Sequence, residues 1–125
     1  MTREKRRILC IEDHQDTCEM LTFALQTSGY EVVSAPTGEK GLSNVLTESF
    51  DAILMDTNLP DISGIELCKQ IRESDIPIPI IFYSGEARPE LIDEAMKAGA
   101  QAYLTKPIDP FEVEKTLASL LEIYA

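Results

Sequence analysis

Five short runs of apolar residues recur along the chain, and each is followed by a segment whose apolar residues have helical spacing. The runs cover residues 8–11, 31–35, 52–55, 78–83 and 102–104. Short apolar runs of this kind indicate buried strands. A regular alternation of strand and helix requires parallel strands joined by right-handed crossovers. The sequence therefore predicts an α/β domain with a parallel sheet covered by helices on both faces.

The expected helices carry apolar stripes and ordinary start and stop signals. Ser63 stands three residues before Glu66, which forms a capping box. Pro89 suits the first position of a helix, whereas Gly29 and Gly99 suit helix ends. Apolar residues at helical spacing mark four of the expected helices: Cys18, Leu21 and Leu25; Leu42, Val45 and Leu46; Leu67 and Ile71; and Val113, Leu117 and Leu121. In the fourth helix along the chain, Ile92, Ala95 and Met96 are expected to face inward.

Length and charge limit the classes of function that need to be considered. A chain of 125 residues has the size of one domain, which we expect to span residues 1–125 with a core from about 7 to 123. Lys and Arg total 11 against 22 for Asp and Glu, so the net charge is -11. Such a surface repels nucleic acids and anionic membranes. We expect a cytoplasmic protein that binds neither nucleic acid nor membrane directly.

The three cysteines, Cys10, Cys18 and Cys68, do not form a recognisable motif. No Cys-x-x-Cys pair is present, and the number is odd. Cysteines in this setting are usually small, reduced and mostly buried residues of a cytosolic protein. We expect that role here in preference to a metal or redox site.

Polar residues stand directly after several of the expected strands. Glu12 and Asp13 follow the first strand, and Asp56 follows the third. Ser84 ends the fourth strand, and Lys106 follows the fifth. In an open parallel sheet the ligand site lies beyond the carboxyl ends of the strands. We therefore expect these residues to meet at one edge of the sheet.

The residue types in this set indicate phosphoryl chemistry assisted by a cation. Three carboxylates converging on one crevice repel one another, and Mg²⁺ is the natural compensating ion because it prefers oxygen ligands and binds phosphate oxygens. Lys106 adds a positive charge that can pair with Asp56 or with a phosphoryl oxygen. The hydroxyl of Ser84 can donate a hydrogen bond to the same oxygen. A carboxylate nucleophile would form an acyl phosphate.

The order and placement of these residues resemble those of receiver domains from response regulators, including the chemotaxis type, in two-component signalling. The matching segments are residues 8–13 (ILCIED), Asp56 with Leu59, Pro60 and Gly64, Ser84 with Gly85, and residues 102–107 (AYLTKP). The similarity extends from about residue 7 to the last helix. It implies one doubly wound sheet of five parallel strands, in the flavodoxin-like order 2-1-3-4-5, flanked by five helices.

The resemblance also implies catalytic and switching roles. Asp56 would be the phosphorylation site, Lys106 would pair with the phosphoryl group, and Ser84 would sense it. Tyr103 resembles the aromatic switch residue, which turns inward when Ser84 moves. The peptide bond between Lys106 and Pro107 resembles one that is usually cis in the family, a conformation that costs little before proline.

A divalent cation is part of the same implication. The family binds Mg²⁺, or Mn²⁺, through residues that match Asp13 and Asp56, with the backbone carbonyl of Asn58 as the usual third ligand. Glu12 matches the acidic neighbour that acts on the metal through water. Such a domain catalyses only its own phosphorylation and dephosphorylation.

The implied partners are a histidine kinase or phosphotransfer protein upstream and an effector downstream. The output face would consist of the fourth helix, the fifth strand and the fifth helix, around residues 88–121. This face would dock a separate effector protein or a fused domain, and many receivers also form homodimers through it. The sequence leaves open whether the chain is a whole regulator or part of a longer one.

Three other functions compete with this interpretation. An aspartyl-phosphate phosphatase needs an aspartate two residues after its nucleophile, where this chain has Asn58. A nucleotide- or flavin-binding module would have a glycine- or hydroxyl-rich loop after the first strand, where Glu12 and Asp13 stand instead. A degenerate receiver that serves only as an interaction scaffold typically lacks the acceptor or the acidic pair, and both are present here.

A few nearby residues have plainer expectations. His14 is expected to be a solvated residue at a helix start, and Asp61 an ordinary loop residue. Ser84 stands where threonine is more common in the family, and Gly85 where alanine is usual. Tyr83 is bulky and has a polar tip, and nothing in the pattern explains its presence before Ser84.

Overall fold

Strands and helices alternate along the whole of residues 5–123, which are the residues that the computed structural model describes. The alternation predicted from the apolar runs is therefore confirmed. The strands are β1 (Arg7–Ile11), β2 (Glu31–Ala35), β3 (Ala52–Asp56), β4 (Ile80–Ser84) and β5 (Ala102–Thr105). The helices are α1 (Gln15–Thr27), α2 (Gly38–Thr47), α3 (Gly64–Glu73), α4 (Pro89–Ala98) and α5 (Pro110–Ile123).

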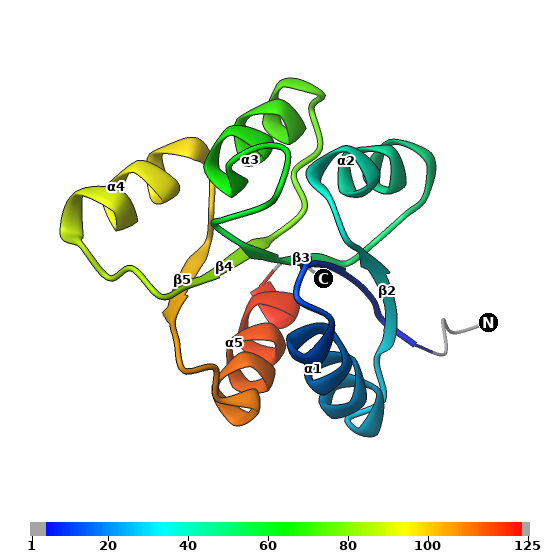
Figure 1. The fold of residues 1–125 in the computed structure, drawn as a ribbon. Coiled ribbons are helices and arrows are strands. Elements are labelled where there is room, and N and C mark those ends of the chain that lie inside the picture. The colour runs from blue at the N-terminus through cyan, green and yellow to red at the C-terminus, as the bar shows by residue number, and fades with distance from the viewer. Residues whose placement is uncertain (1–4, 124–125) are drawn as a thin grey trace.

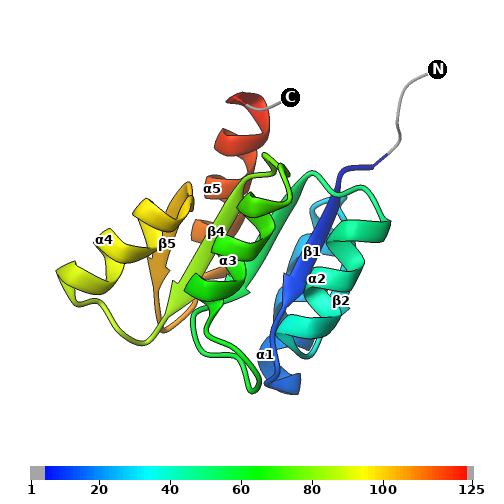
Figure 2. The same ribbon diagram turned by 90° about the horizontal axis from the view of Figure 1, so that it is seen from above.

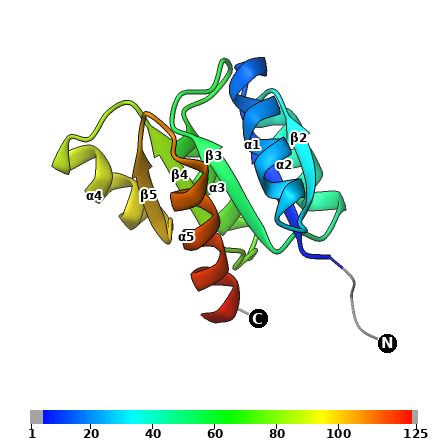
Figure 3. The same ribbon diagram turned by 90° about the horizontal axis from the view of Figure 1, so that it is seen from below.

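The sheet has the order β2-β1-β3-β4-β5, and all four strand pairs are parallel. Helices α1 and α5 cover one face, and α2, α3 and α4 cover the other (Figure 1). The two faces can be followed separately in Figure 2, with α3 in front, and in Figure 3, with α1 and α5 in front. The doubly wound fold predicted from the sequence is confirmed. Its switch point lies between β1 and β3, where the strand order reverses.

The core consists of two apolar layers, one on each face of the sheet. Successive residues of β3 alternate between them, because side chains of a strand point to opposite faces. Ala52 and Leu54 pack with α1 and α5, whereas Ile53 and Met55 pack with α2, α3 and α4. Each fully buried Leu or Ile contributes roughly 1.5–3 kcal/mol through the hydrophobic effect. This two-sided burial fixes the strand ends in space, and with them the residues that follow.

The helix boundaries follow the signals in the sequence. The hydroxyl oxygen of Ser63 accepts a hydrogen bond from the backbone N–H of Glu66 at 3.1 Å, as its capping position predicts. Pro89 begins α4, and Gly99 ends it with φ of 117°. Gly29 follows α1 with φ of 95°. Both glycines lie in the left-handed region, which other residues enter at a cost.

Two local expectations were wrong. The fourth strand begins at Ile80 and not at residue 78, because Pro79 has no N–H to donate and contributes only its carbonyl, which accepts from Ile53. Met96 does not face inward, since 42% of its surface is exposed. Leu46, which is expected only to mark the second helix, lies in α2 with 56% of its surface exposed. Each stands one residue, and so about 100° of helical rotation, beyond the buried residue before it.

None of the helices between residues 5 and 123 has the length and apolarity needed to cross a bilayer.

Gly64 lets α3 begin in direct contact with the end of β3. Its N–H donates to the carbonyl of Thr57 at 2.8 Å. A Cβ atom at this position would collide with the carbonyl oxygen of Asp56 and lie 2.9 Å from Cε1 of Phe82. The close approach of helix and strand therefore requires a residue without a side chain.

We expect Gly64→Ala to lower the free energy of unfolding by about 1–3 kcal/mol, because the new methyl group overpacks a buried contact. Urea denaturation would measure the loss. Gly85→Ala is the matched control: Gly85 is exposed, a Cβ there meets nothing within 4 Å, and its effect should stay within about 0.5 kcal/mol. Equal effects of the two changes would contradict the close-approach explanation.

Candidate functional site

Three acidic side chains converge at the carboxyl ends of β1 and β3. Glu12 and Asp13 follow β1, and Asp56 is the last residue of β3. One carboxylate oxygen from each lies within 4.8 Å of the others. Glu12 and Asp56 are buried, with 3% and 5% exposed, while Asp13 is exposed. The structure thus brings together the three carboxylates that the sequence predicted to meet, and Asp13 stands at the opening to solvent.

Asp56 has a positive charge and a backbone donor on its two oxygens. The ammonium group of Lys106 lies 3.0 Å from Oδ2, and the backbone N–H of Asn58 donates to Oδ1 at 2.9 Å. Lys106 follows β5, and its own N–H donates to the carbonyl of Ser84 at 2.8 Å. The peptide bond between Lys106 and Pro107 is cis, as expected. Lys106 is therefore placed beside Asp56 by the pairing of β5 with β4.

The carboxylate of Glu12 is held by two donors. Tyr83 donates its hydroxyl to Oε1 at 2.6 Å, and the backbone N–H of His14 donates to Oε2 at 2.9 Å. Burial raises the pKa of Glu12 above its usual range, and these two hydrogen bonds partly offset that effect. The only hint of this contact in the sequence is a large residue with a polar tip inside a buried strand.

The hydroxyl of Ser84 is fully buried and is held by its neighbours. It accepts hydrogen bonds from the hydroxyl of Thr57 at 2.7 Å and from the backbone N–H of Glu86 at 3.1 Å. No sequence motif points to Thr57. Tyr103 is half-buried, and its hydroxyl donates to the carbonyl of Glu86 at 2.6 Å. Glu86 therefore connects the two residues that the sequence predicts to form a switch.

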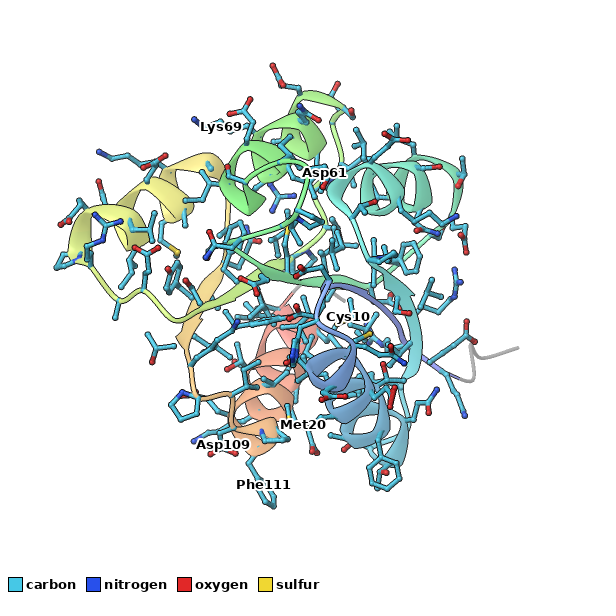
Figure 4. The ribbon with its side chains drawn as sticks, in the orientation of Figure 1. Cys10, Met20, Asp61, Lys69, Asp109 and Phe111 are labelled. Atoms are coloured by element: carbon cyan, nitrogen blue, oxygen red, sulfur yellow. The ribbon has the colours of Figure 1, made fainter. Side chains whose placement is uncertain are left out.

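The plainer expectations for residues around the site are met. His14 is exposed and caps α1, with Nδ1 accepting from the N–H of Thr17 at 3.3 Å. Asp61 lies in the loop between β3 and α3, where Figure 4 places it near the start of α2. Its carboxylate accepts from the N–H groups of Gly38 and Glu39 at 2.8 and 2.9 Å. These two bonds lower the pKa of Asp61.

The burial of the cysteines agrees with the expectation that they are mostly buried. Cys10 and Cys68 are buried, Cys18 is half-buried, and none of the three is in a disulfide. Figure 4 shows Cys10 in the interior, close to β1 and α1.

The geometry suits a hard cation and an anionic group bound side by side. The carboxylate oxygens supply the ligand type that Mg²⁺ prefers. Lys106 supplies a compact positive charge on the other side of Asp56, which an anionic oxygen can approach. The exposed position of Asp13 leaves a path from solvent to the cluster.

Comparison with known proteins identifies the family. The sequence model described as "Response regulator receiver domain" matches residues 8–118. The chain is 36% identical over 118 residues to the alkaline phosphatase synthesis transcriptional regulatory protein PhoP of Bacillus subtilis, covering 93% of this chain and 48% of that protein. Against the CAI-1 autoinducer sensor kinase/phosphatase CqsS of Vibrio cholerae, identity is 33%, with 86% of this chain and 16% of that protein covered.

The chain belongs to the response regulator receiver domain family. A CheY-like receiver domain from Methanospirillum hungatei superposes with a TM-score of 0.90 at 30% identity, covering 94% of each chain. The chemotaxis response regulator CheY4 of Vibrio cholerae gives 0.87 at 32% identity, covering 92% of this chain and 98% of that one. The chain is thus a signalling domain of the two-component type. It spans less than half the length of each of these two relatives, PhoP and CqsS.

Repulsion within the acidic cluster of this receiver domain should be measurable without any cation. Asp13→Asn removes the exposed one of three carboxylates that have oxygens within 4.8 Å of one another, so the free energy of unfolding in EDTA should rise by about 1 kcal/mol. Urea denaturation checks this. Asp16→Asn is the matched control, since it removes an exposed acid from the first turn of α1, where a negative charge is favourable. If Asp13→Asn were no more stable than Asp16→Asn, the cluster would not be repulsive.

Proposed function

We propose that this receiver domain accepts a phosphoryl group on Asp56 from a histidine kinase or phosphotransfer protein. The main support is that the Asp56 carboxylate lies in the acidic cluster and also 3.0 Å from the ammonium group of Lys106. A carboxylate oxygen attacks phosphorus, the bond from phosphorus to the donor nitrogen breaks, and an acyl phosphate forms. Hydrolysis of that bond returns Asp56 to its resting state.

The proposed cofactor is Mg²⁺ or Mn²⁺. Asp13 and Asp56 would be direct ligands, the backbone carbonyl of Asn58 the third, and Glu12 would act through a water. When bound, the cation neutralises charge on the phosphoryl oxygens and orients them for in-line attack. The support for this assignment is that the three carboxylates converge within 4.8 Å, because such a cluster needs a positive charge to offset its repulsion.

Lys106 and Ser84 would respond to the product. Phosphorylation would remove the negative charge of the Asp56 carboxylate. Lys106 could then pair with a phosphoryl oxygen instead. Ser84 has a hydroxyl proton that can be donated to another phosphoryl oxygen. Any movement of Ser84 would pull on Glu86 through their hydrogen bond of 3.1 Å. Tyr103 would sense that movement, since its hydroxyl is bound to the carbonyl of the same residue.

The proposed output face is formed by α4, β5 and α5. Phosphorylation would bias a two-state equilibrium of this face, which would dock an effector protein or a fused domain, or form a homodimer. The relatives include a transcriptional regulatory protein, so a fused or separate output module is a reasonable partner. The net charge of -11 argues against direct nucleic-acid or membrane binding by residues 1–125. A cytoplasmic location suits a kinase-linked signalling domain.

An aspartyl-phosphate phosphatase is a weaker candidate. It needs a general acid two residues after the nucleophile, and Asn58 has only an amide there. The backbone N–H of Asn58 donates to Asp56 instead. We propose that the domain turns over no external substrate.

Asp56→Asn should abolish phosphorylation, because an amide oxygen is a far weaker nucleophile than a carboxylate. The test is intact-mass spectrometry after incubation with acetyl phosphate and MgCl2. Asp75→Asn is a matched control: Asp75 has a positive φ of 58°, which asparagine also tolerates, and it should be phosphorylated like the wild type. A phosphorylated Asp56→Asn protein would overturn the assignment.

Beryllium trifluoride with Mg²⁺ should act as a phosphoryl mimic on Asp56. We expect amide resonances of Ser84, Glu86 and Tyr103 to shift, because hydrogen bonds connect these residues in a chain from the site. Nuclear magnetic resonance spectra recorded before and after addition provide the measurement. Shifts limited to residues 12, 13 and 56–58 would argue against the proposed route to the output face.

A further inference from the structure

Tyr83 is a buried tyrosine with contacts on both sides of the phosphoacceptor. It lies on β4 beside β3, and its partner in the strand register is Asp56. Its side chain is fully buried. The hydroxyl donates to Oε1 of Glu12 at 2.6 Å, and the ammonium group of Lys106 lies 5.6 Å from the ring centroid.

The side chain of Tyr83 reaches across a strand to make the first of these contacts. In the sheet, β3 lies between β4, which carries Tyr83, and β1, which leads to Glu12. The phenol therefore extends past the end of β3, where Asp56 stands, to reach the acidic loop. Tyr83 thus contacts both Glu12, in the loop after β1, and Lys106, the residue after β5.

Both contacts favour particular positions of their partners. An O–H donor at 2.6 Å from a carboxylate is a short, charge-assisted hydrogen bond. Burial raises the pKa of Tyr83 above its usual range, so the hydroxyl remains a donor at neutral pH. The other oxygen of Glu12 accepts from His14, and the two bonds together leave the carboxylate one orientation. An ammonium within about 6 Å of a ring face is attracted by it.

We propose that Tyr83 is a positioning residue for phosphoryl transfer, fixing the carboxylate of Glu12 through its hydroxyl and the ammonium of Lys106 through its ring. The inference rests on the proposed function of Asp56. It assigns two separable effects to one side chain. The hydroxyl acts on cation affinity through Glu12, and the ring acts on the transfer step through Lys106.

Tyr83→Phe removes the hydroxyl and keeps the ring. We expect MgCl2 to bind about tenfold more weakly, as when other groups that orient a metal site are removed. Isothermal titration calorimetry measures that affinity. The rate of phosphorylation by acetyl phosphate at saturating MgCl2 should stay close to that of the wild type, because Lys106 still meets the ring.

Tyr83→Leu removes both the hydroxyl and the aromatic ring. It should weaken MgCl2 binding as much as Tyr83→Phe does and, in addition, lower the rate at saturating MgCl2 by about threefold. Tyr30→Phe is the control for loss of a tyrosine hydroxyl, since Tyr30 is half-buried and stands before β2, at the other end of the sheet. Its MgCl2 affinity and rate should equal those of the wild type.

A double-mutant cycle separates positioning from a general structural role. If Tyr83 acts through Glu12, then Tyr83→Phe should have no further effect on MgCl2 affinity in a Glu12→Ala background. Urea denaturation of each variant confirms that the folded protein is compared. Equal weakening in both backgrounds, or wild-type affinity for Tyr83→Phe alone, would overturn the inference.

Failure of the proposed function would look different. In that case the wild-type protein itself would take no phosphoryl group on Asp56, whatever residue stands at position 83. A wild type that is phosphorylated on Asp56, with a Tyr83→Phe variant indistinguishable from it, would leave the proposed function intact and reject only the role of Tyr83.

Discussion

Electrostatic repulsion among three carboxylates is the constraint around which this site is organised. A parallel sheet ends all its strands at one edge, so residues that are 44 positions apart in the chain, Glu12 and Asp56, come within 4.8 Å. Two of the three acids are also buried, which makes their charges harder to solvate. Lys106 offsets part of this charge at 3.0 Å. The remaining excess of negative charge favours a cation at this edge of the sheet.

The sequence predicted the strand ends and the charged residues that follow them, because apolar runs and strand–helix alternation depend on local pattern. It could not predict contacts that depend on which strands are neighbours. Thr57 meets Ser84 because β3 lies beside β4. Tyr83 can reach Glu12 because only one strand, β3, lies between β4 and β1. No sequence motif relates the residues that these contacts connect. The exposure of Leu46 and Met96 has a different, local cause, since each follows a buried residue by about 100° of helical rotation.

The loop between β4 and α4 connects the site to the rest of the domain through backbone atoms. Glu86 donates its N–H to the buried hydroxyl of Ser84 and accepts the hydroxyl of Tyr103 with its carbonyl. The side chain of Glu86 is not needed for either bond. This arrangement allows residue 86 to vary in chemistry while the connection from β4 to β5 is kept. A shift of Ser84 in the proposed switch would therefore act through the two peptide units that flank the Cα of Glu86.

The carboxylate of Asp61 anchors one side of the site to the start of a helix. By accepting two backbone N–H groups at the start of α2, it ties the loop after the phosphoacceptor to a helix whose own core contacts are fixed. On the opposite side, the exposed loop leading to α4 is held by two hydrogen bonds at Glu86, one with Ser84 and one with Tyr103. Under the proposed function, a change at Asp56 would therefore meet a loop anchored to the start of a helix on one side and a loop held through Glu86 on the other. The direction in which the proposed signal leaves the site would then follow from how each neighbouring loop is anchored.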